Sequence, residues 1–287
     1  MNLSEIIIGC MLWGHWGKNM TQKEQIALLE FCFENGNTTF DHADIYGDYT
    51  TEAGFGNALS LSGIKRQDIQ LISKCGIKLI SKNRPNKVKH YNYSKAYIIQ
   101  SAEASLQNLK TDYLDLFLLH RPSPLMDPEI IADAINTLQQ SGKILNFGVS
   151  NFSASQTALI AKYVTVTANQ IEFSLTKPNA MQDGTLDYMM LHNIETLAWS
   201  PLGLYFKSQS LQIERLKKVT KQLSKKYEVA EEVILLSWIL KHPAKIKPVI
   251  GTTVKQRVIN ATQAAALHLE LEDWFWLLEA SQGQEVP

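Results

Sequence analysis

The stretch NTTFDHADIYG, residues 37–47, runs from residues typical of a β-strand into two acids, a histidine and a tyrosine. The first part predicts a strand, and the abrupt change marks the position at which the strand ends. Such an end either enters an ordinary polar loop or places side chains at a site. The same pattern recurs along the chain, and this recurrence is what decides the fold.

Short apolar runs rich in strand-forming residues occur eight times. They cover 4–10, 37–41, 68–74, 114–120, 143–151, 167–174, 194–202 and 247–251. Most are continuously apolar, which is typical of strands that a parallel sheet buries on both faces.

Amphipathic helical patterns separate these runs. The segment 21–36 has Thr21 as an N-cap and Gly36 as a stop, and 127–143 has Asp127 as a cap. Longer patterns cover 94–110 and 212–242, and we expect the latter to hold two helices, divided near 228–231. Alternation of strand and helix predicts an α/β fold, a (β/α)8 TIM barrel, with 1–287 as a single domain. A doubly wound open sheet is the rival.

Composition narrows the class of protein. The chain has 287 residues, is 45% hydrophobic and carries 28 basic and 28 acidic residues. This balance gives no electrostatic case for nucleic acid or an anionic membrane as partner. No apolar run approaches the roughly 20 residues that span a bilayer. The N-terminal apolar run lacks a basic start, and the three cysteines are widely spaced, so we expect an unexported, cytoplasmic protein.

One glycine motif invites a different interpretation. The letters GFGNAL, residues 54–59, resemble the start of a dinucleotide-binding turn. They lack the third glycine and lie within a helical pattern rather than directly after a strand. We therefore interpret them as helix packing rather than a phosphate-binding turn.

In a barrel, the carboxyl ends of the strands converge on one mouth, where active sites form. Three predicted strands end at Asp41, Lys74 and His120, and Tyr46 follows in the loop after Asp41. Taken singly, each has an ordinary structural explanation as a turn acid, a solvated charge, a loop histidine or a loop tyrosine. Their convergence on one mouth predicts a functional site.

This set of side chains suits proton transfer to an oxygen atom. Tyrosine has an ordinary pKa of about 10, and we expect the Lys74 ammonium to lower that of Tyr46. Asp41 would hold Lys74, His120 would orient a carbonyl oxygen, and Tyr46 would act as the general acid. We find no close metal-ligand cluster and no activated nucleophile, so the metal expectation is none. Electrons would then come from a hydride cofactor.

The sequence also resembles the aldo-keto reductase superfamily over nearly its whole length, and within it the short bacterial oxidoreductase branch. The motifs that carry the resemblance are FDHADIYG, ISKCG, LLHRP, GVSNF, NQIEFS, AWSPLG and VIGTTVKQR, in the family's order. The resemblance implies reduction of a small carbonyl substrate by NADPH on a TIM barrel.

The resemblance also implies roles for particular residues. Asp41, Tyr46, Lys74 and His120 would be the catalytic tetrad, with Tyr46 as the proton donor. The cofactor-binding residues would be Ser150, Asn151 and Gln170 at the carboxamide, Trp199 stacked on the nicotinamide, Ser200 and Leu202 beside the pyrophosphate, and Gly251, Thr252 and Arg257 at the adenosine 2′-phosphate.

Some features depart from the family or stay open. Many relatives carry a lysine in place of Gly251, and the loop 202–210 lacks their glycines and arginine. The altered loop keeps open an alternative function, a nicotinamide-binding regulatory or sensor subunit. Another barrel enzyme, such as a lyase, is a further alternative. Trp13 is expected to line the substrate pocket, with a core position as its alternative. The basic loop 78–93 is a lid or a solvated loop.

Overall fold

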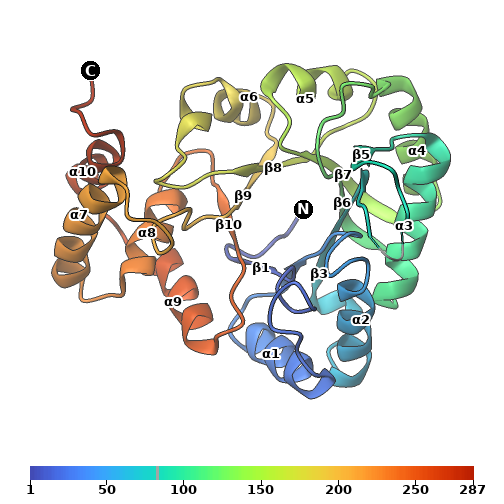
Figure 1. Ribbon diagram of the computed structural model, residues 1–287, viewed down its shortest axis with the longest axis horizontal. Coiled ribbons are helices and arrows are strands. Elements are labelled where there is room, and N and C mark those ends of the chain that lie inside the picture. Colours follow the sequence, from blue (N-terminus) through green and yellow to red (C-terminus); the bar gives the residue numbers. More distant parts are fainter. Residues whose placement is uncertain (82–83) are drawn as a thin grey trace.

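The expected barrel is present in the computed structural model, which describes residues 1–81 and 84–287. Eight parallel strands close into a barrel in the order β1-β10-β9-β8-β7-β6-β3-β2 (Figure 1). These strands are β1 Ile7–Gly9, β2 Thr39–Asp41, β3 Gln70–Cys75, β6 Leu114–Leu119, β7 Ile144–Ser150, β8 Ala168–Glu172, β9 Glu195–Trp199 and β10 Lys247–Ile250. Each lies within or overlaps one of the eight predicted runs, so the TIM barrel is confirmed and the open sheet is excluded.

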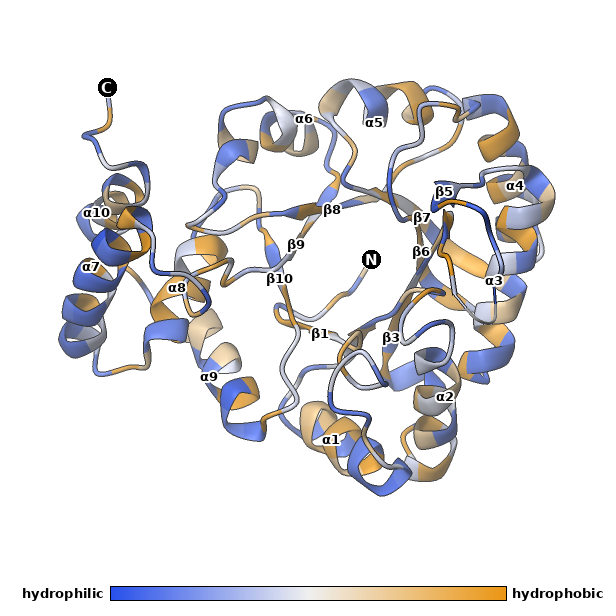
Figure 2. Ribbon diagram, in the orientation of Figure 1, coloured by the Kyte–Doolittle hydropathy of each residue, from blue (hydrophilic) through white to orange (hydrophobic). Residues whose placement is uncertain are grey.

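Helices surround the barrel (Figure 1). They are α1 Gln22–Glu34, α2 Thr51–Ser62, α3 Lys95–Leu109, α4 Pro128–Gln140, α5 Ala154–Ala161, α6 Thr185–Leu191, α7 Leu211–Tyr227, α8 Glu231–Leu240, α9 Lys255–Ala266 and α10 Leu271–Gln282, with short 3-10 turns η1 Arg66–Asp68 and η2 Asn179–Met181. The helices carry both hydrophobic and hydrophilic residues (Figure 2), as expected of helices that cover a barrel with one face and meet solvent with the other. Within the described residues, no helix has the length and apolar character needed to cross a membrane.

Local sequence signals place the helix ends. Thr21 accepts a hydrogen bond from the backbone of Glu24, and the Glu24 side chain returns one, a complete capping box. Asp127 caps α4 with Pro128 at its first position. The expected division of 212–242 occurs at Glu228, which has a left-handed conformation after α7. The helix expectations are therefore confirmed.

The barrel interior below the mouth is filled by apolar side chains that point inward from the strands. Leu3, from the N-terminal segment, packs with inward residues of the strands. These are Ile7, Ile72, Leu116, Leu118, Ala168, Leu197 and Val249. Since side chains alternate along a strand, the residue two positions after an inward one also points inward. Lys74, His120, Gln170 and Trp199 occupy such positions.

The GFGNAL segment belongs to α2, and helix packing explains its second glycine. A Cβ added at Gly56 would collide with the backbone oxygen of Asn108, at the end of α3. The glycine thus permits close approach of α2 to α3. A small antiparallel hairpin of β4 Ile77–Lys78 and β5 His90–Tyr91 follows β3 and was not predicted.

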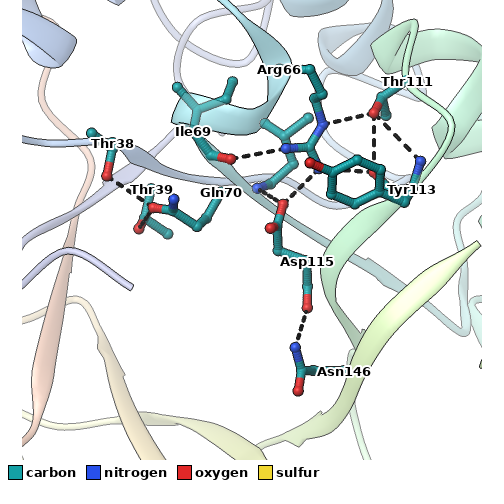
Figure 3. Close-up of polar contacts among 10 residues, drawn as sticks. Thr38, Thr39, Arg66, Ile69, Gln70, Thr111, Tyr113, Asp115 and Asn146 are labelled. Carbon is teal, nitrogen blue, oxygen red and sulfur yellow. Dashed lines mark hydrogen bonds and ion pairs between the residues drawn. The ribbon is translucent and has the colours of Figure 1, made fainter. Parts of the chain in front are cut away.

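A polar network ties together the strand starts at the opposite end of the barrel from the mouth (Figure 3). The Arg66 guanidinium donates to Thr111 Oγ1, to the carbonyls of Ile69 and Tyr113, and to Asp115 Oδ2 at 2.6 Å. Asp115 Oδ2 also accepts from the backbone N–H of Leu71 at 2.8 Å. One partly buried arginine therefore links the segment before β3 to β6.

We expect Arg66→Ala to lower the free energy of unfolding by about 1–3 kcal/mol, because it leaves several partly buried acceptors without their charged donor. Lys95→Ala is the control: its ion pair with Asp133 has a similar length, 2.8 Å, but is exposed, so its loss should cost under about 1 kcal/mol. Urea unfolding of both variants tests this. Equal effects would contradict a structural role for the Arg66 network.

Candidate active site

Lys74 is the centre of the site and has no solvent-exposed surface. Its ammonium donates to Asp41 Oδ2 at 2.7 Å, to the backbone carbonyl of His42 at 2.7 Å and to the Tyr46 hydroxyl at 3.2 Å. An ammonium has three protons, and three acceptors surround this one. The buried charge is thus fully hydrogen-bonded, and its direction toward Tyr46 is fixed.

Both carboxylate oxygens of Asp41 accept hydrogen bonds. Its Oδ1 accepts from Gln170 Nε2 at 2.9 Å, while Oδ2 accepts from Lys74. Asp41 as a whole is only 2% exposed. Asp41 comes from the end of β2 and Gln170 from β8 across the barrel, so closure of the barrel is what creates this contact.

The protonation of Lys74 and Tyr46 follows from burial and mutual charge. Burial favours a neutral Lys74, but the Asp41 charge and Tyr46 outweigh it and raise the pKa of Lys74. For Tyr46, burial raises the pKa, and the nearby Lys74 ammonium opposes this only in part. The Lys74 ammonium does lower the Tyr46 pKa, as expected, but burial outweighs it and the net pKa is raised. Desolvation of the phenolate exceeds the attraction of an ammonium that Asp41 already neutralises.

His120 faces Tyr46 from the end of β6. The two ring centroids are 6.1 Å apart, with the planes nearly perpendicular. Burial, then the charges of Lys74, Arg121 and Lys89, hold the pKa of His120 well below its ordinary value. Its Nδ1 is buried without a partner among the described residues. His120 is consequently a neutral imidazole at physiological pH.

A second group of side chains continues the site across β7, β8 and β9. Ser150 Oγ donates to the carbonyl of Gln170 at 2.9 Å, and Asn151 Nδ2 donates to Ser150 Oγ at 2.8 Å. Trp199 Nε1 donates to Asn151 Oδ1 at 2.8 Å. The structure thus brings Ser150, Asn151, Gln170 and Trp199 into one connected set beside the Lys74 group.

The remaining predicted residues lie at the outer edge of the mouth. Ser200 is exposed with a left-handed backbone, and Leu202 is half-buried in the following turn. Gly251 and Arg257 are exposed and Thr252 is half-buried, around the start of α9. Helix α9 has Val254 at its N-cap and no capping side chain, which leaves its first N–H groups available to an anion.

Trp13 lies in the core, not at the substrate pocket where it was expected. It is fully buried and packs against Phe40 and Phe55, with ring centroids 6.4 and 5.6 Å away. It has no surface to offer a substrate and is a core residue. Trp16 is the aromatic residue near the mouth: it is 40% exposed, and its ring lies 6.4 Å from that of Tyr46. The loop that holds Trp13 and Trp16 is rich in glycine and has no strand or helix periodicity, so its sequence does not show which tryptophan is buried.

The hairpin after β3 occupies much of the predicted basic loop 78–93, of which residues 82–83 lie outside the described residues. Tyr49 connects the hairpin to the loop after β2, since its hydroxyl accepts from the N–H of Leu79 at 3.2 Å.

Among the residues the structure describes, no cluster of histidine, cysteine and acidic side chains could hold a metal ion.

Comparison with known proteins gives a consistent result. The family model described as Aldo/keto reductase family matches residues 5–277. The chain is 40% identical to the uncharacterized oxidoreductase YcsN of Bacillus subtilis, with 100% of this chain and 97% of that protein covered. It is 36% identical to a 6-dehydroglucose reductase of Agrobacterium fabrum, with 100% and 97% covered.

Solved structures agree on the fold. A crystal structure of an aldo-keto reductase from Klebsiella pneumoniae in complex with NADPH superimposes with a TM-score of 0.79. The two chains are 21% identical, and the match covers 99% of this chain and 92% of that one.

We expect Asp41→Asn to destabilise the fold by about 3–5 kcal/mol, because it leaves the buried Lys74 charge without its counter-ion. The double variant Asp41→Asn with Lys74→Met removes that charge as well and should recover part of the loss. Urea unfolding of both measures the difference. A double variant no more stable than Asp41→Asn alone would show that the ion pair is not what holds this site.

Proposed function

Since the chain belongs to the aldo/keto reductase family, a class of NADP-dependent oxidoreductases, we propose that it reduces an aldehyde or ketone to an alcohol, with Tyr46 as the proton donor. One observation carries this proposal. The buried Lys74 ammonium lies 3.2 Å from the Tyr46 hydroxyl and is fixed there by Asp41. An ammonium so placed stabilises the charge that forms on Tyr46 as its proton leaves.

The outer site fits a dinucleotide that carries a 2′-phosphate. Trp199 offers a half-buried ring at the mouth, and its orientation is fixed by Asn151. The start of α9 combines uncapped N–H groups with Arg257, which makes no ion pair among the described residues. A guanidinium can bind a phosphate through two hydrogen bonds. When bound, reduced NADP supplies the hydride to the carbonyl carbon.

The protein's own groups hold the carbonyl and move the proton. The neutral His120 imidazole can donate a hydrogen bond to the carbonyl oxygen, and the proton that the oxygen takes up then comes from Tyr46. Tyr46 retains its proton at neutral pH because burial raises its pKa, and donates that proton as the oxygen gains charge. Lys74 and Asp41 keep the Tyr46 hydroxyl in place. Trp16, beside Tyr46, is proposed as a wall of the substrate pocket in place of Trp13.

The intact polar core also bears on the alternative function. A sensor subunit needs a binding surface for the nucleotide but no proton donor. The burial of Lys74 and its contact with the Tyr46 hydroxyl support the enzyme, because a site that only binds a nucleotide has no need of them. In the altered loop 202–210, Tyr205 is buried and donates to Glu231 of α8 at 2.8 Å, so the loop has an anchor of its own. No observation in the described residues favours the sensor over the enzyme.

We expect Tyr46→Phe to lose at least about 100-fold in kcat for a simple aldehyde, the scale of a positioned general acid, while it still binds NADPH. The change in total tryptophan fluorescence on titration with NADPH measures binding, and NADPH oxidation measures turnover. The wild-type rate should be flat from about pH 6 to 9, because Tyr46 stays protonated and His120 neutral across that range. Unchanged turnover in the variant would refute the role of Tyr46.

The substrate panel for this assay should pair simple aldehydes and ketones with 6-dehydroglucose, since a relative is named for its reduction. Binding of NADPH without turnover of any compound would favour the sensor. Failure to bind NADPH would contradict the assigned cofactor.

Coenzyme preference gives a separate prediction. We expect Arg257→Met to weaken NADPH binding roughly 10-fold or more and to leave NADH binding nearly unchanged, because only NADPH carries the 2′-phosphate. Conversely, Gly251→Lys should strengthen NADPH binding. A side chain fits there, since an added Cβ would meet only Leu12 Cδ1 at 4.0 Å. Fluorescence titration with both coenzymes tests the pair, and equal losses for NADPH and NADH in Arg257→Met would contradict the assignment.

A further inference from the structure

Arg121 is a charged residue at the mouth that the proposed reaction does not use. It follows His120 directly, at the carboxyl end of β6. Its guanidinium carbon lies 5.2 Å from the centre of the Trp199 ring, at the end of β9. In the barrel, β7 and β8 separate these two strands. The side chain therefore reaches across the site from the His120 side to the Trp199 side.

The backbone of Arg121 is fixed on the hairpin side. Tyr93, which is almost fully buried, donates its hydroxyl proton to the Arg121 carbonyl and accepts from the Arg121 N–H at 3.3 Å. The guanidinium itself, which is half-buried, pairs with no carboxylate among the described residues. Arg66 shows the contrast, because its guanidinium is saturated by protein acceptors.

The same side of the mouth carries further positive charge. The sequence has no acidic residue between Asp68 and Glu103, although the chain as a whole is neutral. Lys89, beside the hairpin strand β5, is close enough to His120 to help lower its pKa. Arg84 lies 4.4 Å over the ring of Tyr49, in the loop after β2. Asp44, in the loop after β2, is half-buried, and its pKa is raised well above the ordinary value, chiefly by burial.

We propose that Arg121, assisted by Lys89, binds an anionic group of the substrate, so that the preferred substrate is a carbonyl compound bearing a carboxylate or phosphate. This inference rests on the proposed carbonyl reduction. A carbonyl oxygen placed between Tyr46 and His120 leaves the rest of the substrate at the mouth, next to Arg121. A planar guanidinium with free donors matches a carboxylate or phosphate in two parallel hydrogen bonds.

The test compares matched substrates in the full-length enzyme. One pair is 4-carboxybenzaldehyde and its neutral methyl ester, and a second is glyceraldehyde 3-phosphate and glyceraldehyde. We expect the wild type to prefer the anionic member of at least one pair, and the pairs distinguish carboxylate from phosphate. Arg121→Gln should reduce the anionic-to-neutral ratio of kcat/KM by about 10-fold or more, the scale of one charged hydrogen bond. Arg121→Lys should restore part of it.

Two controls separate this effect from general charge and from coenzyme binding. Lys89→Gln should lower the ratio less than Arg121→Gln does, and Lys218→Gln, an exposed lysine on α7, should not change it. Added salt should lower kcat/KM for the anionic member only, because exposed charges are screened. The affinity for NADPH is measured for each variant.

Three outcomes would overturn the inference. The first is a wild-type preference for neutral aldehydes, 6-dehydroglucose among them. The second is an equal loss of kcat/KM for both members of a pair in Arg121→Gln. The third is a loss in Arg121→Gln that is confined to NADPH affinity. The last would assign Arg121 to the cofactor. If no carbonyl compound is reduced at all, the proposed function itself fails, which is a distinguishable result.

Discussion

The buried ion pair between Lys74 and Asp41 is the constraint on which the rest of the site depends. A lysine with no exposed surface is unstable in a protein interior unless its charge is paired and its protons are bound. Here Asp41 provides the charge, and the His42 carbonyl and Tyr46 hydroxyl complete the set of acceptors. The contacts that stabilise the buried charge of Lys74 also hold its ammonium against the Tyr46 hydroxyl. One set of hydrogen bonds therefore stabilises the lysine and positions it beside the tyrosine.

The barrel supplies the positions for this arrangement. Its interior layer is apolar, and the strand period of two places Lys74, His120, Gln170 and Trp199 one step above it at the mouth. Water is excluded from below by that layer and by Leu3 of the N-terminal segment. The charged interactions above therefore act in a medium of low polarity, which strengthens them. The Arg66 network holds the strand starts at the far end (Figure 3) and leaves the mouth free for chemistry.

Charge is distributed unevenly between the interior of the site and its rim. In the interior, Lys74 and Asp41 compensate each other, His120 is neutral and Tyr46 keeps its proton. At the rim, Arg121, Lys89 and Arg84 are basic and form no ion pair within the part of the chain that the structure describes. A neutral interior suits a reaction in which an uncharged carbonyl becomes an alcohol. A basic rim suits recognition of the part of a substrate that does not react.

The sequence by itself determined the barrel, because eight continuous apolar runs alternate with capped helical patterns and each signal is local. It also placed Asp41, Lys74 and His120 at strand ends, since the position of an apolar-to-polar change can be read from neighbouring residues. The pairing of Gln170 with Asp41 joins residues 129 positions apart and needs the closed barrel. Burial relative to distant residues likewise decided that Trp13 is in the core while Trp16 is at the mouth, and that the pKa of Tyr46 rises. The contact, the burial and the pKa each depend on residues that are distant in the sequence and that only the folded chain brings together.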